Sequence, residues 1–249
     1  MQLYFIRHGQ SVNNAHWDTD EYKDTGRTAD PTLTRKGIEQ AQYTADFLAQ
    51  SHPEVVKHWI DVQNTCGYGL THLYCSLMKR AVHTGSIIAD RLGIELKAHV
   101  DMHEIGGIFL KEQVGDEEII HIQHGHSRTY FENHYPKLIL PEEVDARGWW
   151  AGGIEPRENE ALRAQRIIDF LKRKHLGTDD RVGVITHGGI YRKIFKQLFN
   201  IQEKLDSDKQ FKFRIILNNC SISRIDIDEE SIMLLYHNRT DFLPCELIT

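Results

Sequence analysis

The sequence predicts an α/β fold, a three-layer α/β/α sandwich with a mostly parallel central sheet and an inserted cap region. Two apolar segments, residues 3–6 and 181–186, have the short length and the branched or aromatic composition of buried strands. The second segment is apolar throughout its centre, as expected of a strand covered on both faces. Segments with the apolar spacing of helices lie between the predicted strands, and this alternation is typical of α/β proteins.

The size and charge of the chain limit what it can be. Its 249 residues fit one large domain, so we expect a single domain over residues 1–249 with a cap inserted at about 105–155. A formal net charge of −6 argues against binding to nucleic acid or to an anionic membrane surface. No run approaches the ~18 apolar residues of a membrane span, the four cysteines form no CxxC pair, and no signal peptide is in view. These features favour a cytoplasmic protein with reduced thiols, and they leave a homodimer open.

The first predicted strand ends in Arg7, His8 and Gly9. A cation and an imidazole therefore lie at the carboxyl edge of the sheet, where open α/β sheets bind ligands. Gly9 allows a sharp turn or a close approach of the backbone to an anion. The polar residues that follow, Asn14 among them, add no charge. Taken alone, this stretch is equally compatible with a strand that leads into a polar loop.

Between residues 14 and 100 the pattern predicts loops, helices and two further strands. A polar loop runs to about Thr32, and Thr34 has the position of an N-cap for a helix that ends near Gln50. Residues 51–70 indicate a short helix and a glycine-rich turn, and residues 71–75 and 95–99 indicate strands on either side of a helix from 76 to about 92. Arg80 falls in the first turn of that helix, where the helix dipole disfavours a cation. It is therefore either a solvated side chain or a ligand for an anion.

Residues 105–155 carry no familiar motif, and we expect a cap made chiefly of helix and loop. His121, His124 and His126 form a local cluster that invites a metal-binding interpretation. No carboxylate or cysteine is obviously paired with them, and a chain with 15 histidines produces such clusters by chance. The sequence therefore predicts no metal site, and it leaves the role of the cluster open.

The last third of the chain predicts a second site-forming strand end. Pro156 starts a helix that runs to about residue 174, and the strand 181–186 leads through His187, Gly188 and Gly189 into another helix. A strand, a glycine-rich turn and a helix start direct free N–H groups and a positive helix end toward the turn, which suits a phosphate. Residues 211–217, 220–227 and 231–236 alternate well enough to form closing strands.

Four motifs together resemble the histidine phosphatase superfamily, also called the phosphoglycerate mutase-like family. They are Arg7-His8-Gly9, residues 76–80, His103-Glu104 and residues 185–189. Their order and spacing fit that family, and the resemblance covers most of residues 1–199. It implies that His8 becomes phosphorylated, and that Glu104 is the general acid, with its neighbour His103 as the competing candidate. It assigns catalysis to Arg7, His8, Arg80, Glu104 and His187, and substrate binding to Arg7, Asn14, Arg80, His187 and Gly188.

The chemistry of these residue types agrees with that assignment. A neutral imidazole is a good nucleophile toward phosphorus, and a covalent intermediate divides the transfer into two easier steps. Neighbouring cations such as Arg7 and Arg80 favour the neutral ring. Guanidinium groups also match the oxygens of a phosphoryl group in a bidentate manner.

We therefore predict a metal-independent histidine phosphatase, a phosphoric monoester hydrolase that acts on a small phosphorylated substrate without any cofactor. One alternative is a phosphoglycerate mutase, although residues 29–34 lack the aromatic and glycine pattern of that branch. The other is a phosphate-binding or scaffold protein with little turnover, which would have no need to keep a nucleophile. The sequence does not identify the substrate, whose selection we expect to involve residues 105–155.

Overall fold

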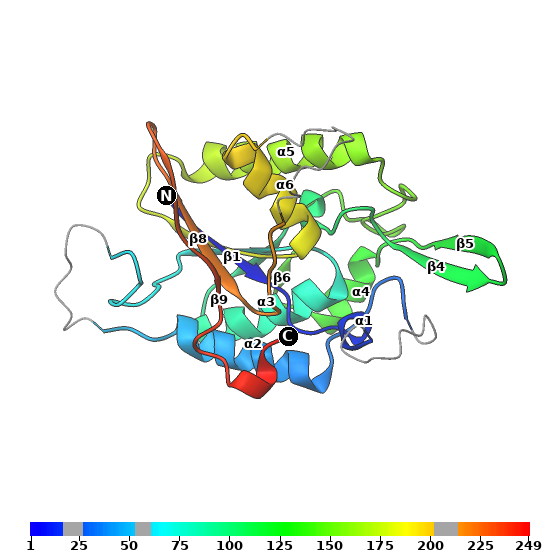
Figure 1. Ribbon diagram of the computed structural model, residues 1–249, viewed down its shortest axis with the longest axis horizontal. Helices are drawn as coiled ribbons and strands as arrows, with labels where there is room; N and C mark the ends of the chain where they lie inside the picture. The colour runs from blue at the N-terminus through cyan, green and yellow to red at the C-terminus, as the bar shows by residue number, and fades with distance from the viewer. Residues whose placement is uncertain (17–26, 53–60, 202–213) are drawn as a thin grey trace.

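The computed structural model describes residues 1–16, 27–52, 61–201 and 214–249. A seven-stranded sheet lies between two layers of helices (Figure 1), in the order β6-β3-β2-β7-β1-β8-β9. The five strands from β6 to β1 are parallel, and β8 and β9 close the sheet in the antiparallel sense. This is the predicted mostly parallel α/β/α sandwich. The strands of the sheet are β1 (Gln2–Arg7), β2 (His72–Cys75), β3 (Leu96–Ala98), β6 (Leu138–Ile139), β7 (Arg181–Thr186), β8 (Ile222–Ile227) and β9 (Ile232–Arg239).

Two pairs of helices cover the two faces of this sheet. Helices α2 (Arg35–Leu48) and α3 (Lys79–Leu92) lie on one face, and α5 (Arg157–His175) and α6 (Gly188–Leu198) lie on the other (Figure 1). Thr34 caps α2 as predicted, because its side chain accepts a hydrogen bond from the Gly37 N–H. The shorter elements are α1 (Val12–Ala15), α4 (Arg128–His134) and the 3₁₀ turns η1 (Val100–Met102) and η2 (Cys245–Leu247).

Strand β1 explains why both faces of the sheet are filled. Leu3 and Phe5 pack into the core beneath α5 and α6, whereas Tyr4 and Ile6 pack into the core beneath α2 and α3. Successive side chains of a strand point to opposite faces, so a continuous apolar run fits only a strand that is covered on both sides. The sheet is therefore buried between the two helix layers. Because β1, β7 and β2 are parallel neighbours, their carboxyl ends meet at one edge.

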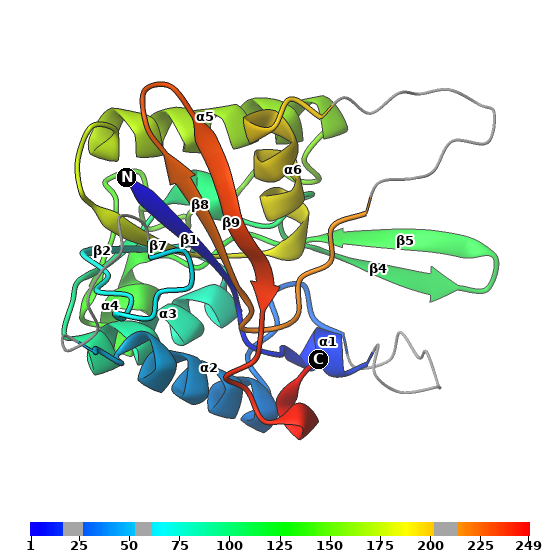
Figure 2. The same cartoon turned by 60° about the vertical axis from the view of Figure 1, so that its left-hand side comes forward.

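The region 105–155 differs from the prediction of a chiefly helical and irregular cap. It contains a hairpin of β4 (Phe109–Val114) and β5 (Glu117–Ile122) that projects from the body (Figure 2). Gly115 has a φ of 63° in the two-residue turn, a conformation that favours glycine and that hairpin turns of this length require. Strand β6 then pairs with β3 in the main sheet. The rest of the segment is helix α4 and irregular chain, as predicted, so the prediction missed only the strands, whose signal is the branched residues on both sides of this turn.

Several predicted segments touch residues outside the described part of the chain. These are the loop before Thr32, which includes residues 17–26, the short helix within 51–70, which overlaps 53–60, and the closing strand 211–217, of which 211–213 are not described. Residues 214–217 form no strand, while the other two closing strands correspond to β8 and β9. Within the described ranges, no helix is both long and apolar enough to cross a membrane.

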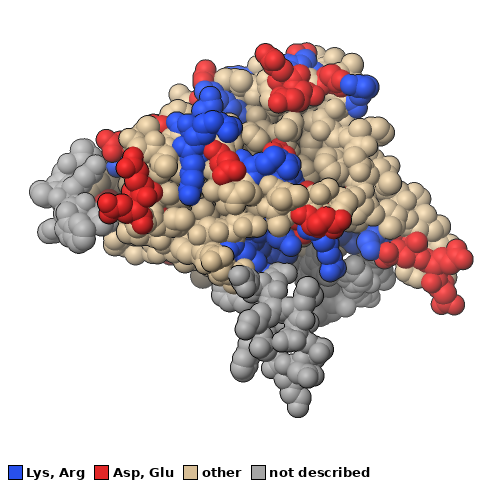
Figure 3. All heavy atoms as spheres, turned by 90° about the horizontal axis from the view of Figure 1, so that it is seen from above, with Lys and Arg blue, Asp and Glu red and all other residues tan. Residues whose placement is uncertain are grey.

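Charged side chains of both signs are mixed on the face that α5 and α6 form (Figure 3). The far end of the projecting hairpin is acidic, with Asp116, Glu117 and Glu118 exposed. The mixture agrees with the modest net charge of the chain, so a basic region for an anion has to be local.

Candidate active site

His8 follows β1 directly and lies at the carboxyl edge of the sheet. Its side chain is buried. Its backbone N–H donates a hydrogen bond of 3.1 Å to the carbonyl oxygen of Thr186 at the end of β7. The ring Nδ1 lies 2.7 Å from the Gly9 carbonyl oxygen. A carbonyl can only accept, so Nδ1 carries the proton and Nε2 keeps its lone pair. Burial first, and then the charges of Arg80 and Arg7, hold the pKa of His8 well below its usual range, so the ring is neutral at neutral pH.

Arg80 is the closest cation to this lone pair. It lies in the first turn of α3, and its Nε donates to Nε2 of His8 at 3.2 Å. On its other side the guanidinium is 3.6 Å from Asp30, whose carboxylate also accepts from the Lys79 N–H. Burial raises the pKa of this carboxyl, while Arg80 acts to lower it. Asp30 therefore fixes Arg80 against His8 rather than leaving it in solvent.

Arg7 and Asn14 line the same site from the other side. The Arg7 guanidinium donates to the carbonyl oxygen of Leu217, which ties it to the segment before β8. The Oδ1 atom of Asn14 accepts from both the N–H and the hydroxyl of Ser11. Asn219, a residue that the sequence did not indicate, donates to the carbonyl oxygen of His8 at 2.9 Å and to Asn14 at 3.3 Å. No local pattern could reveal this contact, because Asn219 lies 211 positions from His8.

His187 lies behind the ring of His8. Its side chain is fully buried, and the centres of the two rings are 5.1 Å apart. Its Nε2 lies 2.9 Å from the Ser76 hydroxyl, and its buried Nδ1 has no hydrogen-bond partner among the described atoms. Burial, followed by the charge of Arg80, holds the pKa of His187 well below its usual range. A buried polar atom without a partner is costly, so this nitrogen is suited to a ligand that enters the site.

Glu104 occupies the start of α6. Its carboxylate accepts hydrogen bonds from the N–H groups of Gly189 at 3.0 Å, Ile190 at 2.9 Å and Ile105 at 2.8 Å. The prediction that these helix-start N–H groups are free for a phosphate is therefore wrong for Gly189 and Ile190. The protein's own carboxylate satisfies them, and the helix dipole stabilises a negative charge at this end.

Gly189 is a glycine because Glu104 lies so close to it. A Cβ atom at this position would lie 2.3 Å from Oε1 of Glu104 and 2.6 Å from Cγ1 of Ile105. A Cβ atom on the neighbouring Gly188 would meet nothing within 4 Å. The two glycines of the His-Gly-Gly turn therefore have different roles, and only the second is required by the position of Glu104.

His103 faces away from this pocket. Its ring packs against Trp150 and Trp149, with ring centres 4.6 Å and 5.5 Å apart, and its Nδ1 lies 2.8 Å from the Glu104 carbonyl oxygen. Burial and the nearby Arg163 lower its pKa to about 4, so the ring is neutral at neutral pH. The turn that carries both residues is anchored by Arg163, which donates to the carbonyl oxygen of His103 and pairs with buried Glu155 at 2.6 Å.

A pocket of about 240 Å³ opens above His8. Its walls bring together five residues predicted from the sequence, Arg7, His8, Asn14, Arg80 and Glu104, and they add two cations, Arg27 and Lys111. His187 and Gly188 are not among the wall residues, although the ring of His187 adjoins that of His8. The walls therefore contain four cationic side chains and one carboxylate, which makes the pocket a local basic region on a protein whose net charge is negative.

The histidine cluster of the cap region does not converge. His121 lies on the exposed hairpin, where its ring pairs with Glu112 at 2.7 Å. His126 stacks on Tyr130, with ring centres 3.8 Å apart. Among the residues described, these histidines and His124 do not form a group whose ligand atoms come close enough for a metal ion.

Comparison with known proteins agrees with this geometry. Residues 3–240 match the family model described as histidine phosphatase superfamily (branch 1). The chain belongs to this superfamily. Its members include phosphatases and mutases, and the predicted resemblance is thereby confirmed.

The individual relatives of this superfamily member are distant. "Probable phosphoglycerate mutase GpmB" of Enterobacter sp. (strain 638) is 25% identical over 230 residues, which are 92% of this chain and 86% of that protein. "Phosphoglycerate mutase-like protein 4" of Arabidopsis thaliana is 26% identical over 197 residues, or 79% of this chain and 70% of that protein.

Solved structures resemble the fold along its whole length. A phosphoserine phosphatase of Entamoeba histolytica, in complex with 3-phosphoglyceric acid, has a TM-score of 0.54 at 18% identity and covers 98% of this chain and 99% of its own. The α-ribazole phosphatase of Shigella flexneri has a TM-score of 0.55 at 16% identity and covers 96% of each chain. At such identities the likeness shows the shared fold alone.

Proposed function

We propose that this protein is a phosphatase that hydrolyses a small phosphomonoester through a phosphohistidine intermediate on His8. The observation that carries the proposal is the hydrogen bond from Nδ1 of His8 to the Gly9 carbonyl oxygen. It fixes the tautomer and leaves the lone pair of Nε2 beside Arg80, in a pocket with three further cations. A pure phosphate-binding site would need the cations but not an oriented, neutral nucleophile.

In the first step, Nε2 forms a bond to phosphorus while the bond from phosphorus to the ester oxygen breaks. The Nε–H of Arg80, which donates to this nitrogen in the structure, then turns to a phosphoryl oxygen, and Arg7 contributes a second guanidinium. His187, whose ring centre is 5.1 Å from that of His8, is proposed to use its unpartnered Nδ1 on an oxygen of the transferred group. Positioned donors of this kind stabilise the charge that spreads over the phosphoryl oxygens.

Glu104 is the proposed general acid, because its side chain lines the pocket whereas His103 faces the two tryptophans. It would give a proton to the leaving oxygen in the first step. In the second step the carboxylate would take a proton from the water that attacks phosphorus, and His8 would be released. The hydrogen bonds from the start of α6 hold the carboxylate in one place through both steps.

The dimensions of the pocket favour a small substrate. Its volume of about 240 Å³ lies below the ~300–1,000 Å³ of sites that enclose drug-sized ligands. Ile105, Phe109 and Leu110 form an apolar part of the wall. We therefore propose a small organic phosphate whose body rests against residues 105–110 at the base of the hairpin.

The names of the curated relatives favour a second candidate, a phosphoglycerate mutase. Incubation with 3-phosphoglycerate and with a generic aryl phosphate distinguishes the candidates. We expect release of phosphate from the aryl ester and little 2-phosphoglycerate from 3-phosphoglycerate. Rapid isomerisation of 3-phosphoglycerate would contradict the phosphatase assignment, and no turnover of any phosphate ester would favour a binding or scaffold protein.

A further inference from the structure

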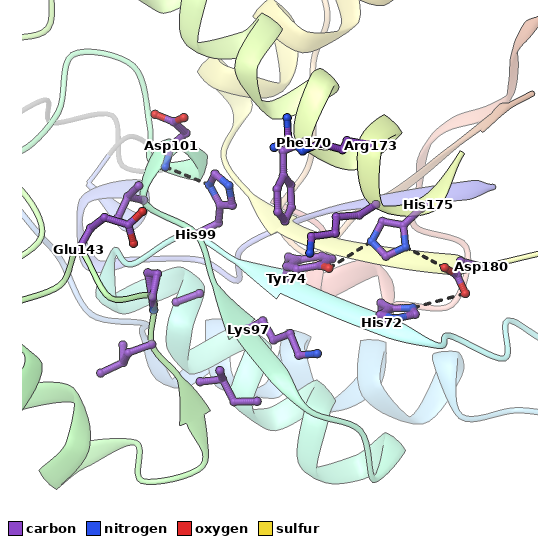
Figure 4. A pocket seen from close by; sticks show the side chains of 16 residues that line it. His72, Tyr74, Lys97, His99, Asp101, Glu143, Phe170, Arg173, His175 and Asp180 are labelled. Carbon is purple, nitrogen blue, oxygen red and sulfur yellow. Dashed lines mark hydrogen bonds and ion pairs between the residues drawn. The ribbon is translucent and has the colours of Figure 1, made fainter. Parts of the chain in front are cut away.

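A second and larger pocket, of about 690 Å³, lies between α5 and strands β2 and β3, and one end of it reaches the amino edge of the sheet (Figure 4). His72 is the first residue of β2, and Asp180 directly precedes β7. These strands are parallel neighbours, so their first residues lie at the amino edge, away from the carboxyl edge that carries His8. His175, the last residue of α5, joins them from the helix layer.

These three side chains converge in the wall of the pocket. Asp180 lies between the two histidines, with Oδ2 at 2.8 Å from Nδ1 of His175 and Oδ1 at 3.7 Å from Nδ1 of His72 (Figure 4). Their ligand atoms all lie within 4.8 Å of one another, the one such group of His, Cys, Asp or Glu in the part of the chain that the structure describes.

We propose that His72, His175 and Asp180 bind a divalent transition metal ion of the zinc class, with one coordination position open to the larger pocket. Tetrahedral ligands with bonds of about 2.0–2.1 Å to the ion lie about 3.3 Å apart. The separations of 2.8 Å and 3.7 Å lie on either side of that value, and the ligand atoms of the two histidines lie within 4.8 Å of each other. Two imidazoles and one carboxylate form a donor set that suits zinc.

The surroundings also orient one of the three ligands. On its far side, Nε2 of His175 meets the Tyr74 hydroxyl at 3.1 Å, an outer partner that orients a metal-ligating imidazole.

Positive side chains near the cluster oppose a cation, but one of them is neutralised locally. Lys97 lies beside His72 (Figure 4), and its ammonium group pairs with Glu95 at 3.2 Å. Arg173 and Lys174, which directly precede His175 in α5, line the same pocket. Once the ion is bound, these cations make the open coordination position attractive to an anionic ligand.

Zinc binding to the purified, chelator-stripped chain tests this proposal directly. Equilibrium dialysis should give about one bound ion per chain, and added zinc should raise the melting temperature, since a ligand that binds only the folded state stabilises it. Both effects should disappear in the double variant His72→Ala, Asp180→Asn, whose half-buried positions tolerate change better than buried His175. Tyr74→Phe should weaken zinc binding by about 10–100-fold.

His99→Gln provides the matched control, because His99 lines the same pocket outside the cluster and should leave binding unchanged. Circular dichroism of the metal-free variants checks that each is folded. Equal zinc binding by the wild type and the double variant, or no binding by the folded wild type, would overturn the proposal. The outcome is independent of the phosphatase assignment, since neither readout uses the pocket at His8.

Discussion

Replacing Gly189 by alanine should remove general acid catalysis although the substitution removes no ionisable side chain. The new Cβ would lie 2.3 Å from Oε1 and 2.9 Å from Cδ of Glu104, and 2.6 Å from the side chain of Ile105. The carboxylate must then leave the start of α6. It would lose hydrogen bonds from Gly189 and Ile190, and hydrogen bonds to a charged group contribute about 1.5–3 kcal/mol each.

The size of the catalytic effect follows from the role of the proton. General acid–base catalysis contributes roughly 10²–10⁴-fold, so kcat/KM of Gly189→Ala should fall by about that factor with an alkyl phosphate. An aryl phosphate such as nitrophenyl phosphate has a leaving group that is stable as an anion, so the loss in the phosphorylation step should be much smaller. Glu104→Gln should show the same dependence on the leaving group, because both variants remove the same proton donor.

Gly188→Ala is the control for this experiment. Its Cβ would meet nothing within 4 Å and its backbone N–H, the group that could contact a phosphate, is kept, so the variant should keep wild-type activity on both esters. Burst kinetics should separate phosphorylation of the enzyme from the attack of water, since the carboxylate is proposed to act in both steps. Full activity of Gly189→Ala on the alkyl ester, or equal losses in the two glycine variants, would refute the assignment of Glu104.

Two further predictions concern pH and stability. Burial and two arginines lower the pKa of His8 below the usual 6.5 of a histidine. The acid limb of the pH profile of kcat/KM should therefore lie below pH 6.5. An acid limb centred at or above pH 6.5 would contradict the assignment of His8. Glu155→Ala leaves the buried Arg163 unpaired, and its free energy of unfolding in urea should fall by about 3–5 kcal/mol. The control Asp46→Ala breaks the exposed pair with Arg91 and should change the free energy of unfolding by less than about 1 kcal/mol. Equal changes in the two variants would show that the buried pair stabilises the protein no more than an exposed one.

The sequence could predict the elements whose signal is local. The apolar runs of β1 and β7 and the cap of α2 depend on neighbouring residues, and each lies where the pattern placed it. The hairpin of residues 109–122 also has a local signal, because Gly115 lies between segments that contain β-branched residues. The predicted helix and loop did not include it.

Long-range contacts could not be predicted from the sequence. Glu104 occupies N–H groups that lie 85 and 86 positions away, so the start of α6 seemed from the sequence to be free. His175 and Asp180 are close in the sequence, but His72 is more than one hundred positions from both, and the pairing of β2 with β7 brings it to them. Strand ends pointed to the edge that binds a ligand, but the partners of each side chain depend on how the layers pack.

The covalent intermediate on His8 tests the central claim most directly. The protein is mixed briefly with a ³²P-labelled or mass-tagged phosphomonoester, quenched in alkali, and mapped by peptide analysis. We predict phosphate on His8, in a bond that survives alkali and is lost in acid, and more of it in Glu104→Gln because the attack of water is slowed. Label on a serine, an aspartate or another histidine, or turnover without any trapped phosphate in either protein, would contradict the account.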